Sequence, residues 1–304
     1  MKRLLALVCI CLAGCGHAPP PAKSATPVVK KRAPRKVSPS PLARVSKRPG
    51  NKTGHVLIVE YHHIRSGKNL MFRPVAEFKR DLNWFYEHDF RPVTMTEYIT
   101  NKMPLAPGAS PVVFTFDDSD SDQYRILPDG TVDPNCAVGI WQDFAESHPD
   151  FPIRATFYVL PYSWGQPRLL AQKLKFLESQ GSEIGNHTYT HPPLRRLSDA
   201  QVEKELGMAQ EAIIKLGVPA PTALAYPYGS VPKHRKILTG FEYDGQKIRF
   251  LSAVLAGAQP APSPSNPHLR PYAVPRIIAN HKRMGLDFWM KEFEEGRVAV
   301  YVEP

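Results

Sequence analysis

The segment Pro111-Val-Val-Phe-Thr-Phe-Asp-Asp118 is a run of strand-forming apolar residues that ends in two carboxylates. Valine and phenylalanine favour strands, and a short continuous apolar run is consistent with a buried strand. Parallel α/β folds place their active sites at the carboxyl ends of such strands. Asp117 and Asp118 are therefore candidate functional residues, although an acidic turn is the simpler interpretation of the pair taken alone.

Strand-like and helix-like segments alternate along the chain on both sides of this strand. Helical spacing runs through 74–88, 167–179 and 198–216, and the last helix opens with Ser198 and Gln201 in capping-box spacing. Further strands are expected at 55–61, 153–159, 181–185, 222–226 and 249–254, with 297–302 closing the sheet. The alternation predicts an α/β fold with a parallel sheet or a barrel, and about 250 residues suit a single barrel. We expect 255–274, which is rich in Pro, Ala and Ser, to form a surface loop.

The charge of the chain is unevenly distributed. The formal net charge is +11, but twelve of the 39 Lys and Arg residues lie in 1–54, where no acidic residue occurs. The remaining 27 basic residues face all 28 acidic ones, so the body of the protein is nearly neutral. A nucleic-acid-binding domain carries its basic patch on the folded surface, and we therefore expect no nucleic-acid partner. Binding of nucleic acid through the basic N-terminal segment alone stays an alternative.

The first fifteen residues have the pattern of an export signal. Lys2 and Arg3 precede an apolar stretch, Leu4 to Leu12, which leads to Leu12-Ala-Gly-Cys15. This end resembles the lipobox of bacterial lipoproteins, which implies an acylated Cys15 and a lipid anchor on a membrane, facing the periplasm or the cell exterior. A plain cleaved signal peptide is the alternative. No apolar run approaches the roughly 20 residues of a membrane span.

The rest of the N-terminal segment is expected to be a tether. Residues 16–54 contain eight prolines and ten Lys or Arg residues, a composition typical of a disordered linker. The predicted organisation is thus a leader at 1–15, a linker at 16–54 and one folded domain at 55–304. Cys136 is the only cysteine after the leader, so no intramolecular disulfide is expected, and we interpret it as a small buried side chain.

Two later motifs carry further candidate residues. The stretch Asn186-His-Thr-Tyr-Thr-His-Pro192 places His187 and His191 four residues apart in an expected loop, and two such histidines can bind one metal ion. The stretch Ala225-Tyr-Pro-Tyr-Gly229 is a strand end that enters a tight turn. Each motif alone is also compatible with an ordinary loop. Together with Asp118, the two histidines would form a two-histidine, one-carboxylate metal site with open positions.

Taken in this order, the motifs at 111–118, 153–160 and 182–229 resemble the polysaccharide deacetylase family, the NodB-homology domains of carbohydrate esterase family four. The resemblance implies a distorted (β/α)7 barrel. It also implies a hydrolase that removes N-acetyl groups from amino sugars of a cell-envelope or extracellular polysaccharide. We expect the domain to be a monomer that binds an acetylated polysaccharide.

The resemblance also implies residue roles. Asp117 would be the general base, Asp118, His187 and His191 would hold a divalent metal, most often Zn2+, and the backbone N–H of Tyr228 would stabilise the oxyanion. The general acid is less defined. The stretch Glu60-Tyr-His-His-Ile64 resembles the first strand of poly-N-acetylglucosamine deacetylases, which favours His62, with His63 and His281 as alternatives.

The chain departs from the family pattern in three places. Many members have an arginine where this chain has Ala225, and Arg276 is the candidate to supply an equivalent charge against Asp117. Ser119 replaces a glycine, and the long segment 120–152, which is expected to wall the cleft, precedes the next strand. The aromatic residues that could stack on sugars, or else belong to the core, are Trp141, Tyr162, Trp164 and Tyr226.

Two other functions fit the same motifs. The same chemistry cleaves esters, so an O-acetyl esterase acting on xylan or a similar polymer is one alternative, and a free hydroxyl rather than a free amine would be its product. A catalytically silent glycan-binding lipoprotein is the other. Retention of Asp117 together with all three metal-ligand candidates argues against the silent protein, since a binder needs no general base.

Overall fold

The computed structural model of the chain describes residues 47–161, 164–257 and 259–304. The leader, its Cys15 and most of the expected linker lie outside the described residues, as does Tyr162. Among the residues that are described, no helix has the length and apolar character that crossing a bilayer requires.

An eight-stranded sheet forms the centre of the domain, and its strands follow the order β10-β1-β3-β4-β5-β6-β9, with β2 pairing to β3 outside this path. The strands are β1 (Leu57–Tyr61), β2 (Phe90–Pro92), β3 (Ser110–Phe116), β4 (Thr156–Val159), β5 (Glu183–Asn186), β6 (Ala223–Ala225), β9 (Ser252–Val254) and β10 (Ile277–Ile278). Every pair in this sheet is parallel. The carboxyl ends of all these strands therefore lie on one side of the domain.

The two edges of the sheet are brought together by the segment 274–278. Val274 pairs with Val254 of β9, and the N–H of Leu255 donates to the carbonyl of Val274 at 2.9 Å. Three residues later, β10 pairs with β1. The sheet thus curls into a distorted barrel of parallel strands, which confirms the fold predicted from the motifs.

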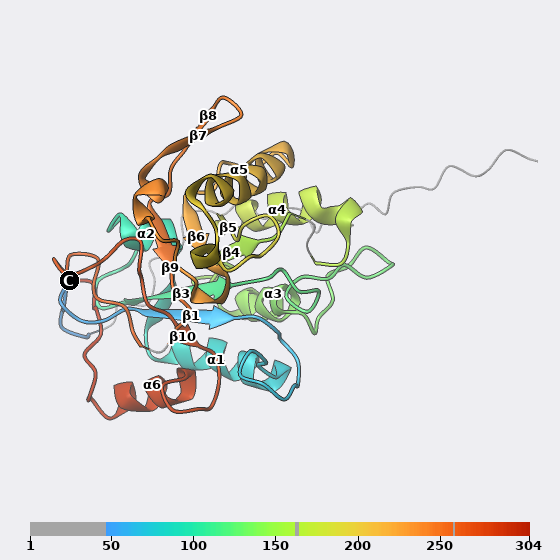
Figure 1. Cartoon of the computed structure of the whole chain (residues 1–304). Helices are drawn as coiled ribbons and strands as arrows, with labels where there is room; N and C mark the ends of the chain where they lie inside the picture. Colours follow the sequence, from blue (N-terminus) through green and yellow to red (C-terminus); the bar gives the residue numbers. More distant parts are fainter. Residues whose placement is uncertain (1–46, 162–163, 258) are drawn as a thin grey trace, which may run out of the picture.

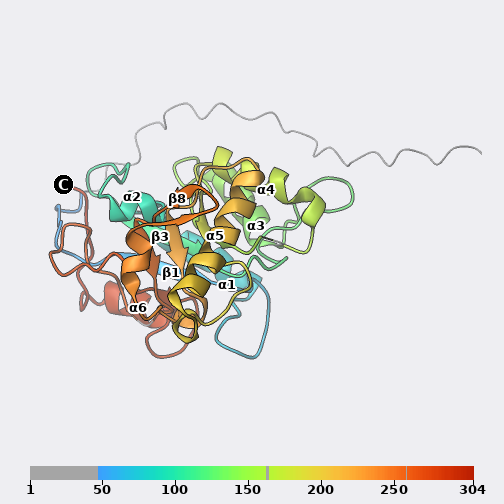
Figure 2. The same ribbon diagram turned by 45° about the horizontal axis from the view of Figure 1, so that its top comes forward.

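Helices surround the strands, which Figure 2 shows at the centre of the domain. They are α1 (Val75–Glu87), α2 (Met95–Ile99), α3 (Ala137–Ser147), α4 (Leu170–Ser179), α5 (Asp199–Lys215) and α6 (Leu286–Glu294). Short 3-10 segments are η1 (Pro167–Leu169), η2 (Leu194–Arg196), η3 (Pro227–Gly229) and η4 (Arg235–Thr239). The expected capping box of α5 is present, because the side chains of Ser198 and Gln201 bond reciprocally to each other's backbone. An antiparallel hairpin of β7 (Phe241–Tyr243) and β8 (Gln246–Ile248) projects beyond the barrel at the top of Figure 1.

The structure differs from the expected elements in two regions. The range 297–302 forms no strand of the sheet, since Val300 and Val302 make only isolated bridges to His55 and Asn51. The closing strand is β10, which at two residues is too short to stand out as an apolar run. The expected surface loop 255–274 is irregular but partly internal, because Ala261 is buried and bridges to Val56.

Segments without a clear sequence pattern also turn out to be ordered. The insertion 120–152, which showed mainly turn signals, contains α3, and Cys136 begins this helix by accepting a hydrogen bond from the N–H of Gly139. Three of the aromatic side chains considered for sugar stacking are buried instead, namely Trp141, Trp164 and Tyr226. These three belong to the interior, which agrees with their interpretation as core residues.

A buried ion pair joins the barrel to the helices on one side. Arg73 and Asp81 are 1% and 0% exposed, and Nε and Nη2 of the arginine donate to the two carboxylate oxygens at 2.8 and 2.5 Å. The hydroxyl of Tyr61 on β1 also donates to Asp81 at 3.0 Å. Nη2 of Arg73 reaches Asp287 on α6 at 2.7 Å. The Arg73–Asp81 pair therefore connects β1, α1 and α6.

We predict that Arg73→Met destabilises the domain by about 3–5 kcal/mol, because it leaves the buried carboxylate of Asp81 without its counter-charge. Urea denaturation followed by circular dichroism measures the change. Arg80→Met is the matched control, since Arg80 also contacts Asp287, at 3.1 Å, but is 54% exposed. The control should cost less than about 1 kcal/mol. Equal losses for the two variants would contradict the importance of the buried pair.

Candidate active site

Three loops at the carboxyl ends of β3, β5 and β6 carry the candidate residues. Asp117 and Asp118 follow β3, His187 and His191 follow β5, and the turn η3 follows β6. Because these strands are parallel and close in the sheet order, their ends converge at the same rim of the barrel, where such folds place their sites.

The side chains of Asp118, His187 and His191 form a compact cluster. The Nε2 atoms of both histidines lie 3.1 Å from Oδ1 of Asp118. Nδ1 of His187 lies 2.9 Å from the carbonyl of Ala225, which holds a proton on Nδ1 and directs Nε2 toward the cluster. Asp118 and His191 are 33% and 21% exposed, so the cluster opens to solvent. Two imidazoles and one carboxylate with an open side fit the donor set of a catalytic zinc site.

The electrostatics of this cluster favour an ionised aspartate. Burial alone would raise the pKa of Asp118, but hydrogen bonds from His187 and His191 outweigh it and hold the pKa well below its usual range. Burial would lower the pKa of His187, yet the hydrogen bond and charges of the two aspartates raise it. The protonation states of these side chains therefore depend on one another.

Asp117 lies next to Asp118 in the chain but in a different environment. It is 2% exposed, and its Oδ1 and Oδ2 accept hydrogen bonds of 2.7 Å from Nη1 and Nη2 of Arg276. Burial opposes ionisation of Asp117, but the charge and hydrogen bonds of Arg276 outweigh it and lower the pKa. The structure thus places Arg276 against the predicted base, as expected from the absence of an arginine at position 225.

The guanidinium of Arg276 is fully engaged. Nε donates to the carbonyl of Leu255 at 2.8 Å, and Nη1 donates to Oγ1 of Thr115 at 3.0 Å. Nη2 also lies 3.2 Å from Oε2 of Glu60. Arg276 itself immediately precedes β10, so the segment that closes the barrel also supplies the cation of the site.

Glu60 is a site residue that the sequence reasoning missed. It is 2% exposed on β1, and burial raises its pKa although Arg276 opposes the shift. Alternation along the strand puts Glu60 and His62 on the same face and Tyr61 on the other. A carboxylate inside an otherwise apolar strand was the signal that could have identified it.

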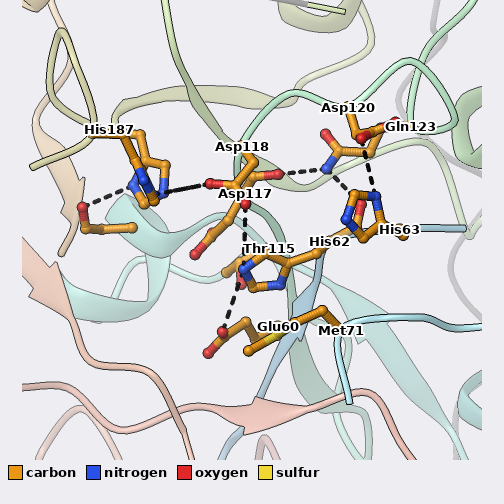
Figure 3. A network of polar contacts seen from close by, with 12 residues as sticks. Glu60, His62, His63, Met71, Thr115, Asp117, Asp118, Asp120, Gln123 and His187 are labelled. Atoms are coloured by element: carbon orange, nitrogen blue, oxygen red, sulfur yellow. Dashed lines mark hydrogen bonds and ion pairs between the residues drawn. The ribbon is translucent and has the colours of Figure 1, made fainter. Parts of the chain in front are cut away.

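Of the three histidines considered as general acid, only His62 lies near the metal-ligand candidates. Its Nε2 is 3.8 Å from Oδ2 of Asp118 and 3.8 Å from Oε1 of Glu60 (Figure 3). His63 instead pairs with Asp120 at 3.0 Å. His281 is 53% exposed and bonds to Glu77 and Asp287 on two helices, at 2.7 and 2.5 Å.

The turn after β6 presents Tyr228 to the cluster. Its backbone is left-handed, with φ 57° and ψ 19°, and its ring, 72% exposed, meets the ring of His191 with centroids 4.7 Å apart. Left-handed non-glycine residues occur in all three site loops, namely Asp118, Ser119, Thr188, His191 and Tyr228. Such backbone strain gathers at functional sites. At Ser119, φ of 54° explains why a glycine suits this position.

A model of the polysaccharide deacetylase family matches residues 106–243, a range that contains β3, β5, β6 and the loops after them. Over these residues the chain is similar to the polysaccharide deacetylase family. This match confirms the resemblance noted in the motifs and supports the enzyme class that it implied.

Curated relatives match the chain only in part. It is 32% identical over 113 residues to the peptidoglycan-N-acetylmuramic acid deacetylase PdaC of Bacillus subtilis (strain 168), covering 33% of this chain and 23% of that protein. It is 29% identical over 136 residues to the peptidoglycan-N-acetylglucosamine deacetylase PgdA of Listeria monocytogenes, covering 43% and 25%. The chain thus spans about a quarter of the length of these relatives.

Solved structures share the fold of this chain over most of its length. The Streptococcus pyogenes deacetylase PplD in complex with acetate aligns with a TM-score of 0.57 and 18% identity, covering 79% of this chain and 98% of that one. IcaB from Ammonifex degensii aligns with a TM-score of 0.51 and 17% identity, covering 74% and 91%. At these identities the likeness concerns the fold alone.

We predict that His187→Ala and His191→Ala each weaken zinc binding by more than about 100-fold, because loss of a ligand should exceed the roughly 10- to 100-fold effect of groups that only orient a ligand. Competition with a chromophoric chelator measures the affinity. His234→Ala is the control, since His234 is 70% exposed and pairs with Asp199. Unchanged zinc affinity in both site variants would rule out this cluster as the metal centre.

Proposed function

We propose that this protein is a metal-dependent hydrolase that removes N-acetyl groups from amino sugars of a cell-envelope polysaccharide. The observation that carries the proposal is the arrangement of Asp117 and Asp118. One carboxylate is buried and fixed by Arg276, and the next one in the chain faces an open pair of histidines. A base beside a metal-ligand set suits the metal-assisted hydrolysis of an amide.

Asp118, His187 and His191 would hold the metal ion, and we propose zinc because of the imidazole-rich donor set. A bound divalent cation supplies Lewis acidity, which activates water and polarises the acetyl carbonyl. Nδ1 of His187, bonded to the carbonyl of Ala225, keeps the ring in the orientation that binding needs.

Asp117 acts as the general base in this proposal. Its lowered pKa keeps it ionised near neutral pH, and each carboxylate oxygen retains a lone pair beyond its bond to Arg276. As the attacking water forms its bond to the acetyl carbon, Asp117 accepts the proton that the water releases. Arg276 holds the carboxylate in one orientation, so the accepting oxygen is placed before substrate arrives.

His62 and Tyr228 complete the reaction. When the carbon–nitrogen bond breaks, Nε2 of His62 donates a proton to the leaving nitrogen, which yields the free amine and acetate. The position of Nε2, 3.8 Å from Asp118, supports this role. The backbone N–H of Tyr228 is proposed to donate to the oxyanion that develops on the acetyl oxygen.

The proposed substrate follows from the relatives and the leader. Two relatives are named as deacetylases of N-acetylated peptidoglycan sugars. The export pattern and lipobox at Cys15 would place this protein at a membrane surface outside the cytoplasm, where such a glycan lies. We therefore propose an envelope polysaccharide as substrate, with the Pro-rich segment as a spacer from the anchor.

The first test is acetate release by the full chain from N-acetylglucosamine oligomers, with added zinc and with a chelator. Asp117→Asn should keep bound zinc and lower kcat by about 10²- to 10⁴-fold, the range of general base catalysis. Asp143→Asn, an exposed aspartate on α3, is the control and should match the wild type. Wild-type turnover in Asp117→Asn would eliminate this residue as the base. Zinc-bound protein that releases acetate only from O-acetylated polymers would replace the amidase with an esterase.

A second prediction concerns the acid. His62→Ala should lower kcat by about 10²-fold or more without loss of zinc, because His62 is absent from the proposed ligand set. His63→Ala, at the adjacent residue, serves as control and should retain most activity. The rates are read from the same acetate assay. A larger loss in His63→Ala than in His62→Ala would reverse the assignment.

A further inference from the structure

Gln123 is a buried amide in the insertion between β3 and α3. It is 0% exposed, and its Nε2 donates to the carbonyl oxygens of His62 and Asp117 at 2.8 and 2.5 Å. These carbonyls belong to the proposed acid and the proposed base. Figure 3 shows both contacts from the one amide nitrogen.

The remaining polar groups of Gln123 are also bonded. Its Oε1 accepts from Nε1 of Trp164 at 3.3 Å. Its backbone N–H donates to the carbonyl of Asp120, and its own carbonyl accepts from the N–H of Val138, both at 3.0 Å. Two carbonyls on one end and an indole N–H on the other permit only one orientation of the amide. The side chain of Gln123 therefore has one fixed orientation.

Gln123 continues the pairing of β1 with β3 beyond the point where the strands end. Regular pairing runs from Leu57 with Val112 to Tyr61 with Phe116, and the N–H of Asp117 still donates to the carbonyl of Tyr61 at 3.0 Å. The residue after β1 is His62, and the Gln123 amide connects its carbonyl to that of Asp117. The strand pairing is complete without this amide, so its effect falls on the two residues past the strand ends.

The insertion around Gln123 is anchored independently. Nζ of Lys173 on α4 donates to the carbonyl of Tyr124 at 2.7 Å, and this ammonium lies 5.7 Å from the ring centroid of Trp164. Burial lowers the pKa of Lys173 to about 8. The insertion therefore acts as a scaffold behind the strand ends, a role beyond that of the cleft wall expected from the sequence.

We propose that Gln123 is a positioning residue that fixes the separation of the acid His62 and the base Asp117 by clamping their backbone carbonyls. The inference rests on the proposed function, because it assigns Gln123 a purpose only if these two residues share one reaction. A displacement of about 1 Å between reacting groups can lower a rate by about 100-fold.

The test is Gln123→Leu, which keeps similar volume and removes both donors. We expect kcat for acetate release to fall by about 10- to 100-fold while KM changes by less than about threefold, since the clamp acts on the chemical step rather than on uniform binding. Zinc content, measured by elemental analysis, should equal that of the wild type. Thermal denaturation gives the accompanying change in stability.

Gln166→Leu is the matched control. Its amide is also bonded to backbone in the same insertion, with Nε2 donating to the carbonyl of Ile126 at 2.7 Å and Oε1 accepting from its N–H at 3.0 Å. It contacts neither strand end of the site, so a similar loss of stability with unchanged kcat is expected. If Gln123→Leu has wild-type kcat, or loses no more kcat than Gln166→Leu, the inference is overturned.

Trp164→Phe provides a second variant in case Gln123→Leu does not fold. It removes the indole N–H that holds Oε1 and leaves Gln123 in place, so a smaller fall in kcat, about three- to tenfold, is expected. Wild-type kcat in Trp164→Phe with a non-folding Gln123→Leu would overturn the clamp. A wild-type protein that releases no acetate under any condition would instead overturn the proposed function, and this inference with it.

Discussion

The ion pair between Asp117 and Arg276 connects the closure of the barrel to the chemistry of its rim. A buried charge pair is stable only where geometry and additional hydrogen bonds compensate for lost hydration. Here both carboxylate oxygens and every nitrogen of the guanidinium have partners, which include Thr115 and the carbonyl of Leu255. The pair therefore ties β3 to the segment before β10, and the same bonds orient the carboxylate for which we propose catalysis.

Two adjacent aspartates acquire opposite properties because of what faces each of them. Asp117 continues the direction of β3 into the interior and meets a cation, whereas the left-handed backbone of Asp118 turns its side chain toward the histidines at the opening. Two further residues contact the ends of β1 and β3. Glu60 pairs with the side chain of Arg276, and Gln123 donates to the backbone carbonyls after both strands. Strained loops hold such a geometry only where the surrounding structure is rigid, and the paired strands supply that rigidity.

Much of this arrangement was predictable from the sequence. The remaining parts were not predictable, and the physical reason can be named for each. Apolar runs marked β1, β3 and β4, and the capping residues Ser198 and Gln201 marked the start of α5, because these signals are local. The pairing of Arg276 with Asp117 was expected only from the family resemblance, since many members carry an arginine where this chain has Ala225. Closure of the barrel by β10 has no local signal, because a strand of two residues is too short to show an alternating pattern in the sequence. Gln123 lies among turn residues, and only the folded chain shows which carbonyls its amide meets.

The segment 274–278 both closes the barrel and carries Arg276. Val274 pairs with β9, and Ile277 pairs with β1, so the backbone around Arg276 is constrained from both sides. An arginine placed here reaches Asp117 only if the barrel closes at this register. The pairing that closes the barrel therefore also orients the proposed base. A substitution that weakens this pairing should lower both the stability of the domain and the proposed activity. In contrast, His187 and His191 lie on the loop after β5, a strand that does not pair with the segment 274–278.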